Sequence, residues 1–246
     1  MKQEYEKYTS EDFGVWRILF ERQIAQLPGM ATDEYLEGIK RIGFTAHQIP
    51  EFEQVNTVLS SYTGWKLHVV AGLIPNKEFF ELLENRYFPS STWLRRMDQL
   101  DYLEEPDMFH DVFGHVPLLT NPHLCNFLAD LSRIALRFID NPYAIELISR
   151  LYWYTVEFGL IRENGELRIY GAGILSSKGE THYSLNDTTP RRITYDVKTI
   201  LQTPYIKERF QDQYFVIESY EQLYNSVSEV ERLLVEAIAE ENLMHQ

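Results

Sequence analysis

Apolar residues recur at helical spacing through much of this chain, and this periodicity restricts its fold more than any other feature. Between residues 122 and 138 the large apolar side chains fall mostly three or four positions apart, which places them on one face of a helix. Similar stripes cover residues 16–27 and 50–62. By contrast, residues 166–175 and 213–219 have the composition of short strands. We therefore predict an α+β fold that is predominantly α-helical, with a few short strands.

Nothing in the sequence divides the chain. Its 246 residues are 44% hydrophobic, enough for one substantial core, and no linker, repeat or low-complexity run interrupts them. We expect a single domain over residues 1–246 whose last part, residues 222–246, is a helix, because Ser219 and Gln222 match a capping box. Helical and strand patterns do not alternate as in βαβ folds, and no glycine-rich phosphate loop is present, so nucleotide binding is disfavoured.

The charge and the cysteine content limit partners and location. A net charge of −14 disfavours nucleic acid and anionic membrane surfaces, because both are negatively charged. No apolar run is long enough to span a bilayer, and the polar start does not resemble a signal peptide. The single cysteine, Cys125, cannot form an internal disulfide. We therefore expect a cytoplasmic protein without nucleic-acid or membrane partners.

Two histidines stand five positions apart in the segment EPDMFHDVFGHVPLL, residues 105–119. Five residues turn an α-helix by about 140°, so the rings of His110 and His115 can meet only where the helix ends or is distorted. Gly114 and Pro117 predict that the helix ends at about His115. The two imidazole rings could then bind the same metal ion.

One carboxylate lies in the apolar segment LYWYTVEFGLI, residues 151–161. This segment predicts a helix buried on almost every side, in which Glu157 must be paired, protonated or bound to a cation. An ion pair with Arg133 or Arg150 is one possibility. With the two histidines, Glu157 would instead complete the facial triad that holds Fe(II) in non-haem oxygenases and leaves coordination positions open. The same three ligands could also hold Zn²⁺ in a hydrolase.

Five strings, in order, resemble the pterin-dependent aromatic amino acid hydroxylases, and among them the short bacterial phenylalanine hydroxylases. The strings are TGWKL, VAGLI, LDYLEEPDMFHDVFGHVPLL, YWYTVEFGLI and YGAGILSSKGE. The similarity extends from about residue 16 to about residue 221. It implies the catalytic-domain fold of that family, with Fe(II) and a tetrahydropterin as cofactors and O₂ as a co-substrate.

The resemblance also implies roles for individual residues on the iron and substrate sides. Arg95 is expected to bind the substrate carboxylate, because its fork suits bidentate recognition, and Trp153 is expected to pack against the substrate ring. Ser176, on the same side, matches a serine that hydrogen-bonds a ligand histidine. The expected iron ligands are His110, His115 and Glu157.

On the pterin side, the resemblance implies backbone and aromatic contacts after the AGL string. Phe79 is expected to stack on the bicyclic ring, and Asp111 to act through water. Val69 stands where the family commonly has a proline, which would loosen this loop. The expected pterin contacts are Gly72, Leu73, Ile74, Phe79, Asp111 and Tyr152.

The implied reaction is hydroxylation of L-phenylalanine to L-tyrosine by a single catalytic domain. Compared with the animal enzymes, we expect no regulatory domain and no tetramerisation helix, and hence a monomer. Hydroxylation of tyrosine is an alternative, since that branch also carries a tryptophan at the position of Trp153. Tryptophan hydroxylation fits less well, because those enzymes have a phenylalanine there. A non-catalytic protein that binds phenylalanine or pterin is a further alternative.

Overall fold

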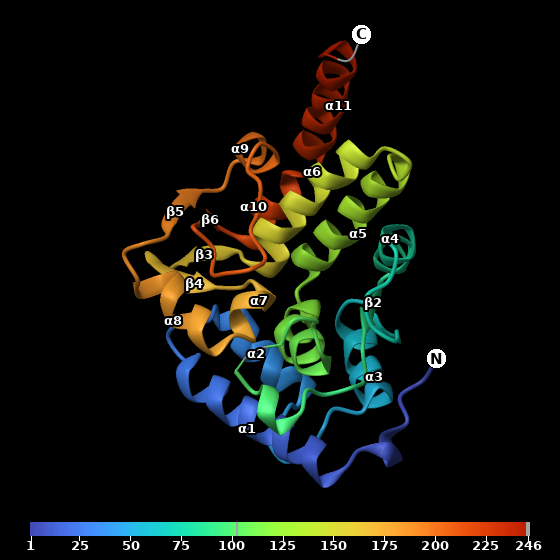
Figure 1. The fold of residues 1–246 in the computed structure, drawn as a ribbon, viewed down its shortest axis with the longest axis vertical. Helices are drawn as coiled ribbons and strands as arrows, with labels where there is room; N and C mark the ends of the chain where they lie inside the picture. Colours follow the sequence, from blue (N-terminus) through green and yellow to red (C-terminus); the bar gives the residue numbers. More distant parts are fainter. Residues whose placement is uncertain (102, 245–246) are drawn as a thin grey trace.

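Helices make up most of the fold of this computed structural model, which describes residues 1–101 and 103–244, and short strands form two small sheets (Figure 1). The α-helices are α1 (Ser10–Gln26), α2 (Asp33–Ile42), α3 (Phe52–Tyr62), α4 (Asn76–Glu84), α5 (Pro122–Arg137), α6 (Pro142–Tyr152), α7 (Ala172–Leu175), α8 (Lys178–Asn186), α9 (Val197–Leu201), α10 (Tyr220–Asn225) and α11 (Val227–Met244). The 3₁₀- and π-helices are η1 (Tyr5–Lys7), η2 (Met97–Gln99), η3 (Phe109–His115), η4 (Val116–Thr120) and η5 (Trp153–Glu157). The strands are β1 (Lys66–Val69), β2 (Tyr87–Ser90), β3 (Leu160–Glu163), β4 (Glu166–Ile169), β5 (Arg191–Thr194) and β6 (Gln213–Ile217).

The two central helices, α5 and α6, both begin at an Asn-Pro pair. The side chains of Asn121 and Asn141 accept the backbone N–H groups of Leu124 and Ala144, which would otherwise lack a partner at the helix start. A proline at the first helical position has no N–H to satisfy. These local signals explain why the predicted starts of both helices are confirmed.

The sheets are small because each strand is only four or five residues long. β1 and β2 pair in parallel, with Val69 opposite Ser90. The other sheet has the order β4-β3-β6-β5, in which β3 runs antiparallel to β4 and parallel to β6. The β3–β4 hairpin turns through Asn164 and Gly165, both with positive φ, as a tight two-residue turn requires.

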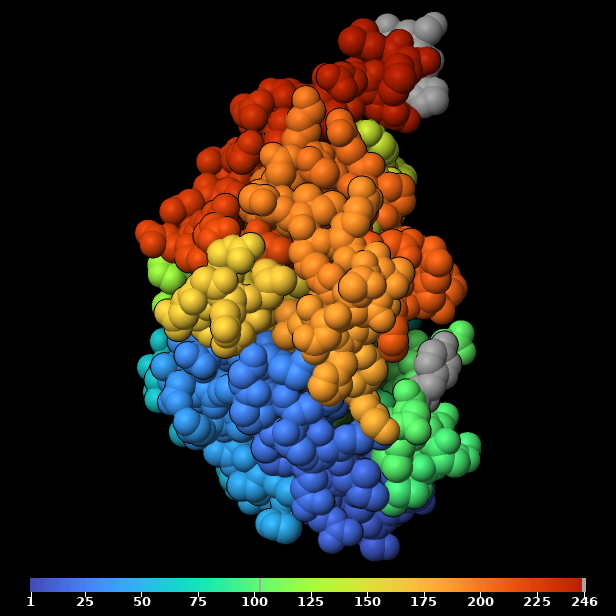
Figure 2. All heavy atoms as spheres, turned by 90° about the vertical axis from the view of Figure 1, so that its left-hand side faces the viewer, coloured from blue at the N-terminus to red at the C-terminus, as the bar shows by residue number. Residues whose placement is uncertain are grey.

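Buried apolar residues form one contiguous cluster that runs from Val15 in α1 to Leu234 in α11. α5 and α6 contact each other in the middle of the molecule, with the four-stranded sheet to one side and α1 and α2 below (Figure 1). On the face shown in Figure 2, the segment from α8 to β5 lies between the N-terminal helices and α11. No helix of the described residues is both long and apolar enough to cross a membrane.

The strand predicted over residues 166–175 is wrong in its second half, where the chain forms α7. The reason is close backbone packing at Gly171. A Cβ atom at this position would lie 2.4 Å from the backbone oxygen of Glu157, so the chain passes against η5 where no side chain fits. β4 therefore ends at Ile169 and the chain turns into a short helix.

The single helix predicted over residues 222–246 is also wrong, because the chain forms α10 and α11 with a break at Ser226. The capping residue is correct, since the Ser219 side chain accepts the N–H of Gln222. The break is held by the Ser226 hydroxyl, which contacts the Leu223 carbonyl and the Tyr195 hydroxyl, each at 2.7 Å. Residues 245–246 of this prediction lie outside the described residues.

Candidate active site

Both histidines and the glutamate lie on π-helical turns. His110 and His115 belong to η3, and Glu157 is the last residue of η5. A π-helix closes i→i+5 hydrogen bonds, so residues five positions apart come to lie on the same side. The predicted distortion between the histidines is therefore confirmed. The predicted end of the helix is not, because the chain continues as the 3₁₀-helix η4, whose first turn accommodates Pro117.

The donor atoms of these three side chains converge on one point. His110 Nε2 lies 3.3 Å from His115 Nε2 and 3.5 Å from Glu157 Oε2, and His115 Nε2 lies 3.1 Å from Glu157 Oε1. One donor atom of each residue lies within 4.8 Å of the others. Two imidazole nitrogens and a carboxylate oxygen arranged in this way fit a divalent metal ion. Ion pairs of Glu157 with Arg133 or Arg150 are not formed, because those arginines pair with Asp130 and Glu146 instead.

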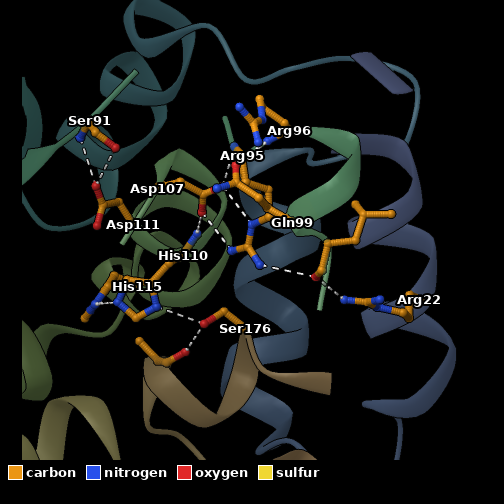
Figure 3. Close-up of polar contacts among 12 residues, drawn as sticks. Arg22, Ser91, Arg95, Arg96, Gln99, Asp107, His110, Asp111, His115 and Ser176 are labelled. Atoms are coloured by element: carbon orange, nitrogen blue, oxygen red, sulfur yellow. Dashed lines mark hydrogen bonds and ion pairs between the residues drawn. The ribbon is translucent and has the colours of Figure 1, made fainter. Parts of the chain in front are cut away.

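The hydrogen bonds around His110 determine which of its nitrogens is free. Its Nδ1 lies 2.9 Å from the Ser176 hydroxyl, and that hydroxyl donates to the carbonyl of Ala172 at 2.8 Å (Figure 3). Since a hydroxyl has one hydrogen, its oxygen must accept from His110 Nδ1–H. In the neutral imidazole, His110 Nε2 is then unprotonated and directed toward Glu157, which is the tautomer that a metal ligand needs.

His115 is buried, whereas the side chains of His110 and Glu157 are 19% and 15% exposed, and the three groups interact electrostatically. Burial by itself would raise the pKa of the Glu157 carboxyl, but His115 and His110 together hold this pKa well below its usual range. Burial would lower the pKa of His110, yet the nearby Glu157 carboxylate raises it. His115 is also packed against the Phe88 ring, with the ring centroids 4.6 Å apart. A carboxylate kept ionised among imidazoles suits the binding of a cation.

Arg95 forms a buried, bidentate ion pair with Asp107, a residue that was not predicted from the sequence. Its Nε and Nη2 donate to the two carboxylate oxygens of Asp107, each at 2.9 Å, and its Nη1 lies 3.4 Å from the Leu100 carbonyl (Figure 3). Asp107 Oδ1 also accepts the backbone N–H of His110 at 3.2 Å. Asp107 therefore connects the guanidinium to the first residue of the candidate metal centre. The available signal was an aspartate that follows a proline and directly precedes the apolar residues Met108 and Phe109.

Trp153 lies at the start of η5, one π-helical turn before Glu157. Its indole stacks on Tyr205 with the ring centroids 4.6 Å apart and the planes at 20°. Phe158 lies on the same indole with an equal centroid separation. The indole N–H donates to Gln211, a contact across 58 positions that no local pattern indicates.

The residues expected around a pterin divide into a side-chain group and a loop. Phe79 and Tyr152 meet edge to face, with the ring centroids 5.5 Å apart. Asp111 accepts the backbone N–H and the hydroxyl of Ser91, at 2.8 and 3.0 Å, and burial raises its pKa. Gly72, Leu73 and Ile74 lie in the loop between β1 and α4, where Leu73 is 77% exposed.

The loop reaches this part of the molecule through the small parallel sheet. Val69, the last residue of β1, pairs with Ser90, and the next residue after Ser90 is the serine that contacts Asp111. The ends of β1 and β2 therefore place the start of the loop near Asp111. Val69 is an ordinary strand residue here, and the strand ends normally without a proline.

Comparisons with known proteins identify the family of this chain. The chain matches the family of biopterin-dependent aromatic amino acid hydroxylases over residues 3–237. It is 49% identical over 226 residues to the phenylalanine-4-hydroxylase of Ralstonia nicotianae. The aligned region covers 92% of this chain and 72% of that protein. The chain belongs to the biopterin-dependent aromatic amino acid hydroxylases.

Solved structures of the phenylalanine hydroxylase from Chromobacterium violaceum have the same fold. One with bound oxidised Fe(III) has a TM-score of 0.93 and 45% identity, over 97% of this chain and 86% of that one. Another, with iron(III) and 7,8-dihydrobiopterin, has a TM-score of 0.92 and 45% identity, over 98% of this chain and 86% of that one. The family and the fold class predicted from the sequence are therefore confirmed.

Proposed function

We propose that this chain is a non-haem iron monooxygenase that hydroxylates L-phenylalanine to L-tyrosine with O₂ and a tetrahydropterin. The convergence of His110, His115 and Glu157 carries the proposal, in a chain that is 49% identical to a phenylalanine-4-hydroxylase. These three residues would hold Fe(II). When bound, iron and the reduced pterin supply the electrons that activate O₂ for insertion into an aromatic ring.

The contribution of the chain to the iron site is orientation. Ser176 fixes the tautomer and the ring plane of His110, and Phe88 packs against His115. Partners of this kind keep metal ligands in place before the ion binds. Three protein ligands on one face would leave the remaining positions for small molecules.

Arg95 is proposed to bind the carboxylate of the amino acid substrate. Asp107 occupies the edge of the guanidinium formed by Nε and Nη2. The edge formed by Nη1 and Nη2 carries one N–H of each nitrogen, and the protein partner of Nη1 is the Leu100 carbonyl at 3.4 Å. Two parallel N–H groups match a carboxylate in the bidentate geometry that arginine favours. Because Asp107 neutralises the guanidinium and fixes its plane, a second carboxylate would meet a rigid fork. Trp153 would then pack on the substrate ring and help to exclude water.

The pterin is proposed to lie against Phe79 and Tyr152, with the backbone of residues 72–74 along its edge. Stacking on aromatic faces suits a flat bicyclic ring. Asp111, already held by Ser91, would contact the pterin through water. Burial raises the pKa of Tyr152 well above its usual range, so its hydroxyl remains protonated.

The experiment that tests this function is anaerobic reconstitution with Fe(II), followed by air, a tetrahydropterin and L-phenylalanine, with the products separated chromatographically. We expect tyrosine to form in step with pterin oxidation, and neither to occur after chelation of the iron. Pterin oxidation without tyrosine would contradict phenylalanine as the substrate, and L-tyrosine and L-tryptophan are then tested. Absence of O₂ consumption with all three amino acids would favour a binding protein, and turnover without O₂ a zinc hydrolase.

We further propose that residues 1–246 act as one catalytic domain, as a monomer in the cytoplasm. The single contiguous core supports one domain, and the buried residues of α11, Val230 and Leu234, belong to that core. The free, buried Cys125 is compatible with a reducing compartment. Light scattering after size-exclusion chromatography tests the oligomeric state, and a mass near twice 29.1 kDa would contradict a monomer.

A further inference from the structure

Gln211, in the segment between α9 and β6, is 2% exposed and uses both ends of its amide. Its Oε1 accepts the indole N–H of Trp153 at 3.0 Å, and its Nε2 donates to the carbonyl of Ile206 at 2.8 Å. Because the donor and the acceptor are both engaged, the amide has one orientation. A buried amide that is paired at both ends in this way holds its partners in place.

The hydrogen bond adds something that stacking cannot supply. Tyr205 and Phe158 fix the plane of the Trp153 indole, at interplanar angles of 20° and 34°. Stacking depends little on which edge of the indole points in which direction, since the π surface is similar after a half-turn of the ring. The N–H marks one edge of the ring. Its bond to Gln211 therefore decides which edge is buried and which edge is presented to a bound molecule.

Gln211 is itself supported by a buried carboxylate on α8. Glu180 Oε1 accepts the backbone N–H of Gln211 at 3.3 Å and the hydroxyl of Tyr214 at 2.7 Å. Ser176, which contacts His110, stands four residues before Glu180. One short segment thus contacts the candidate metal centre at one end and supports the Trp153 partner at the other.

We propose that Gln211 is a positioning residue that sets the edge of Trp153 facing the substrate ring. It acts on substrate binding through Trp153, with no contact to the substrate. The proposal rests on the proposed function, because that function places Trp153 in the substrate pocket. Glu180 maintains the position of the Gln211 backbone.

The test compares Gln211→Met with Gln213→Met in the iron-loaded enzyme. Methionine keeps the length of glutamine but can accept the indole N–H only weakly. Gln213 is the control because its side chain contacts Arg191 and Tyr154 and not Trp153. We expect the KM for L-phenylalanine to rise about 10-fold in Gln211→Met, because one buried hydrogen bond is lost. The KM for the pterin and kcat should stay within about twofold, as should every constant of the control.

Two further measurements separate positioning from a general loss of structure. In a Trp153→Phe background, which lacks the indole N–H, Gln211→Met should add no further rise in KM, because the coupled group is already absent. In the metal-free protein, the four tryptophans give indole N–H signals by NMR, and Trp153→Phe identifies one of them. Gln211→Met should shift that signal and leave the other three in place.

Any of three results would overturn the proposal. These are an unchanged Trp153 signal, equal rises in the KM for L-phenylalanine and the KM for the pterin, or additive effects in the Trp153→Phe background. Failure of the proposed function would appear elsewhere, as absence of tyrosine with the wild-type enzyme. The indole signal is measured without metal or substrate. It therefore tests the link between Gln211 and Trp153 whichever amino acid the enzyme hydroxylates.

Discussion

The two π-helical segments that meet at the candidate metal centre are held in different ways. η3 is held by polar side chains outside it, since Ser176 contacts the ring of His110 and Asp107, two residues before η3, accepts the backbone N–H of His110. η5 is held by close packing, with the Gly171 backbone pressed against the carbonyl of Glu157. The orientation of the His110 imidazole therefore depends on one side-chain hydrogen bond, whereas the position of the Glu157 carboxylate depends on the fit of two backbones.

This difference predicts where the site tolerates substitution. Losing one hydrogen bond on the η3 side leaves a ring that can still reach the metal with some loss of orientation. Losing the fit on the η5 side moves the backbone that carries Glu157, and the interior cannot adjust without strain. We therefore expect larger effects on the η5 side, and the predictions below test that order.

The largest effect is expected for Glu157→Ala, which removes the only carboxylate of the three ligands. Iron affinity should fall by more than about 100-fold, because loss of an outer partner alone costs about 10- to 100-fold. Turnover should be lost with it. Metal analysis after dialysis and a tyrosine assay measure both. Stoichiometric iron with full turnover would contradict the assignment of this ligand.

The packing of η5 is tested by Gly171→Ala. A Cβ atom here would lie 2.4 Å from the backbone oxygen of Glu157 and 2.5 Å from the nitrogen of Gly159. Since both are backbone atoms, the strain should reduce the free energy of unfolding by about 3 kcal/mol or more and weaken iron binding.

Gly72→Ala is the matched control for this substitution, because a Cβ atom at Gly72 meets nothing within 4 Å. Its effect on the free energy of unfolding should stay within about 0.5 kcal/mol. Denaturant titration of both variants makes the comparison. Equal effects of the two substitutions would show that close packing at Gly171 does not determine the position of η5.

Much of this site could be predicted from the sequence, because its chemistry is local. His110, His115 and Glu157 stand out as polar residues in apolar segments, and the Asn-Pro helix starts are encoded within four residues. The π-helical geometry could not be predicted, because α and π turns share the same apolar pattern. The strand pairing of β1 with β2 and the Trp153–Gln211 contact depend on residues that are distant in the sequence.

A pH dependence should come from Glu180, which supports Gln211, the hydrogen-bond partner of Trp153 at the start of η5. Burial raises the pKa of this carboxyl to about 7. In the unfolded chain the pKa is near about 4.3, so between these values the folded state holds a proton that the unfolded state has released. The free energy of unfolding should therefore fall as the pH rises through this window, by up to about 3 kcal/mol.

Glu180→Gln isolates this contribution, since an amide does not titrate. Urea unfolding at several pH values from 4.5 to 7.5 (a range of about 3 units around the window) should give a shallower fall for the variant than for the wild type. The difference between the two curves removes the titration of other groups. Parallel curves would contradict a buried, neutral Glu180.

The smallest effect is expected on the η3 side, for Ser176→Ala. This change removes the hydroxyl that accepts from His110 Nδ1, but the backbone N–H of His110 remains bonded to Asp107. Iron affinity should therefore fall by about 10-fold, at the lower end of the range for outer partners of metal ligands. Ser177→Ala is the control, because Ser177 caps α8 through the N–H of Glu180. It should cost about 1 kcal/mol of stability without changing iron affinity, and a loss of iron affinity as large as that of Ser176→Ala would show that α8 as a whole, and not the serine hydroxyl, orients His110.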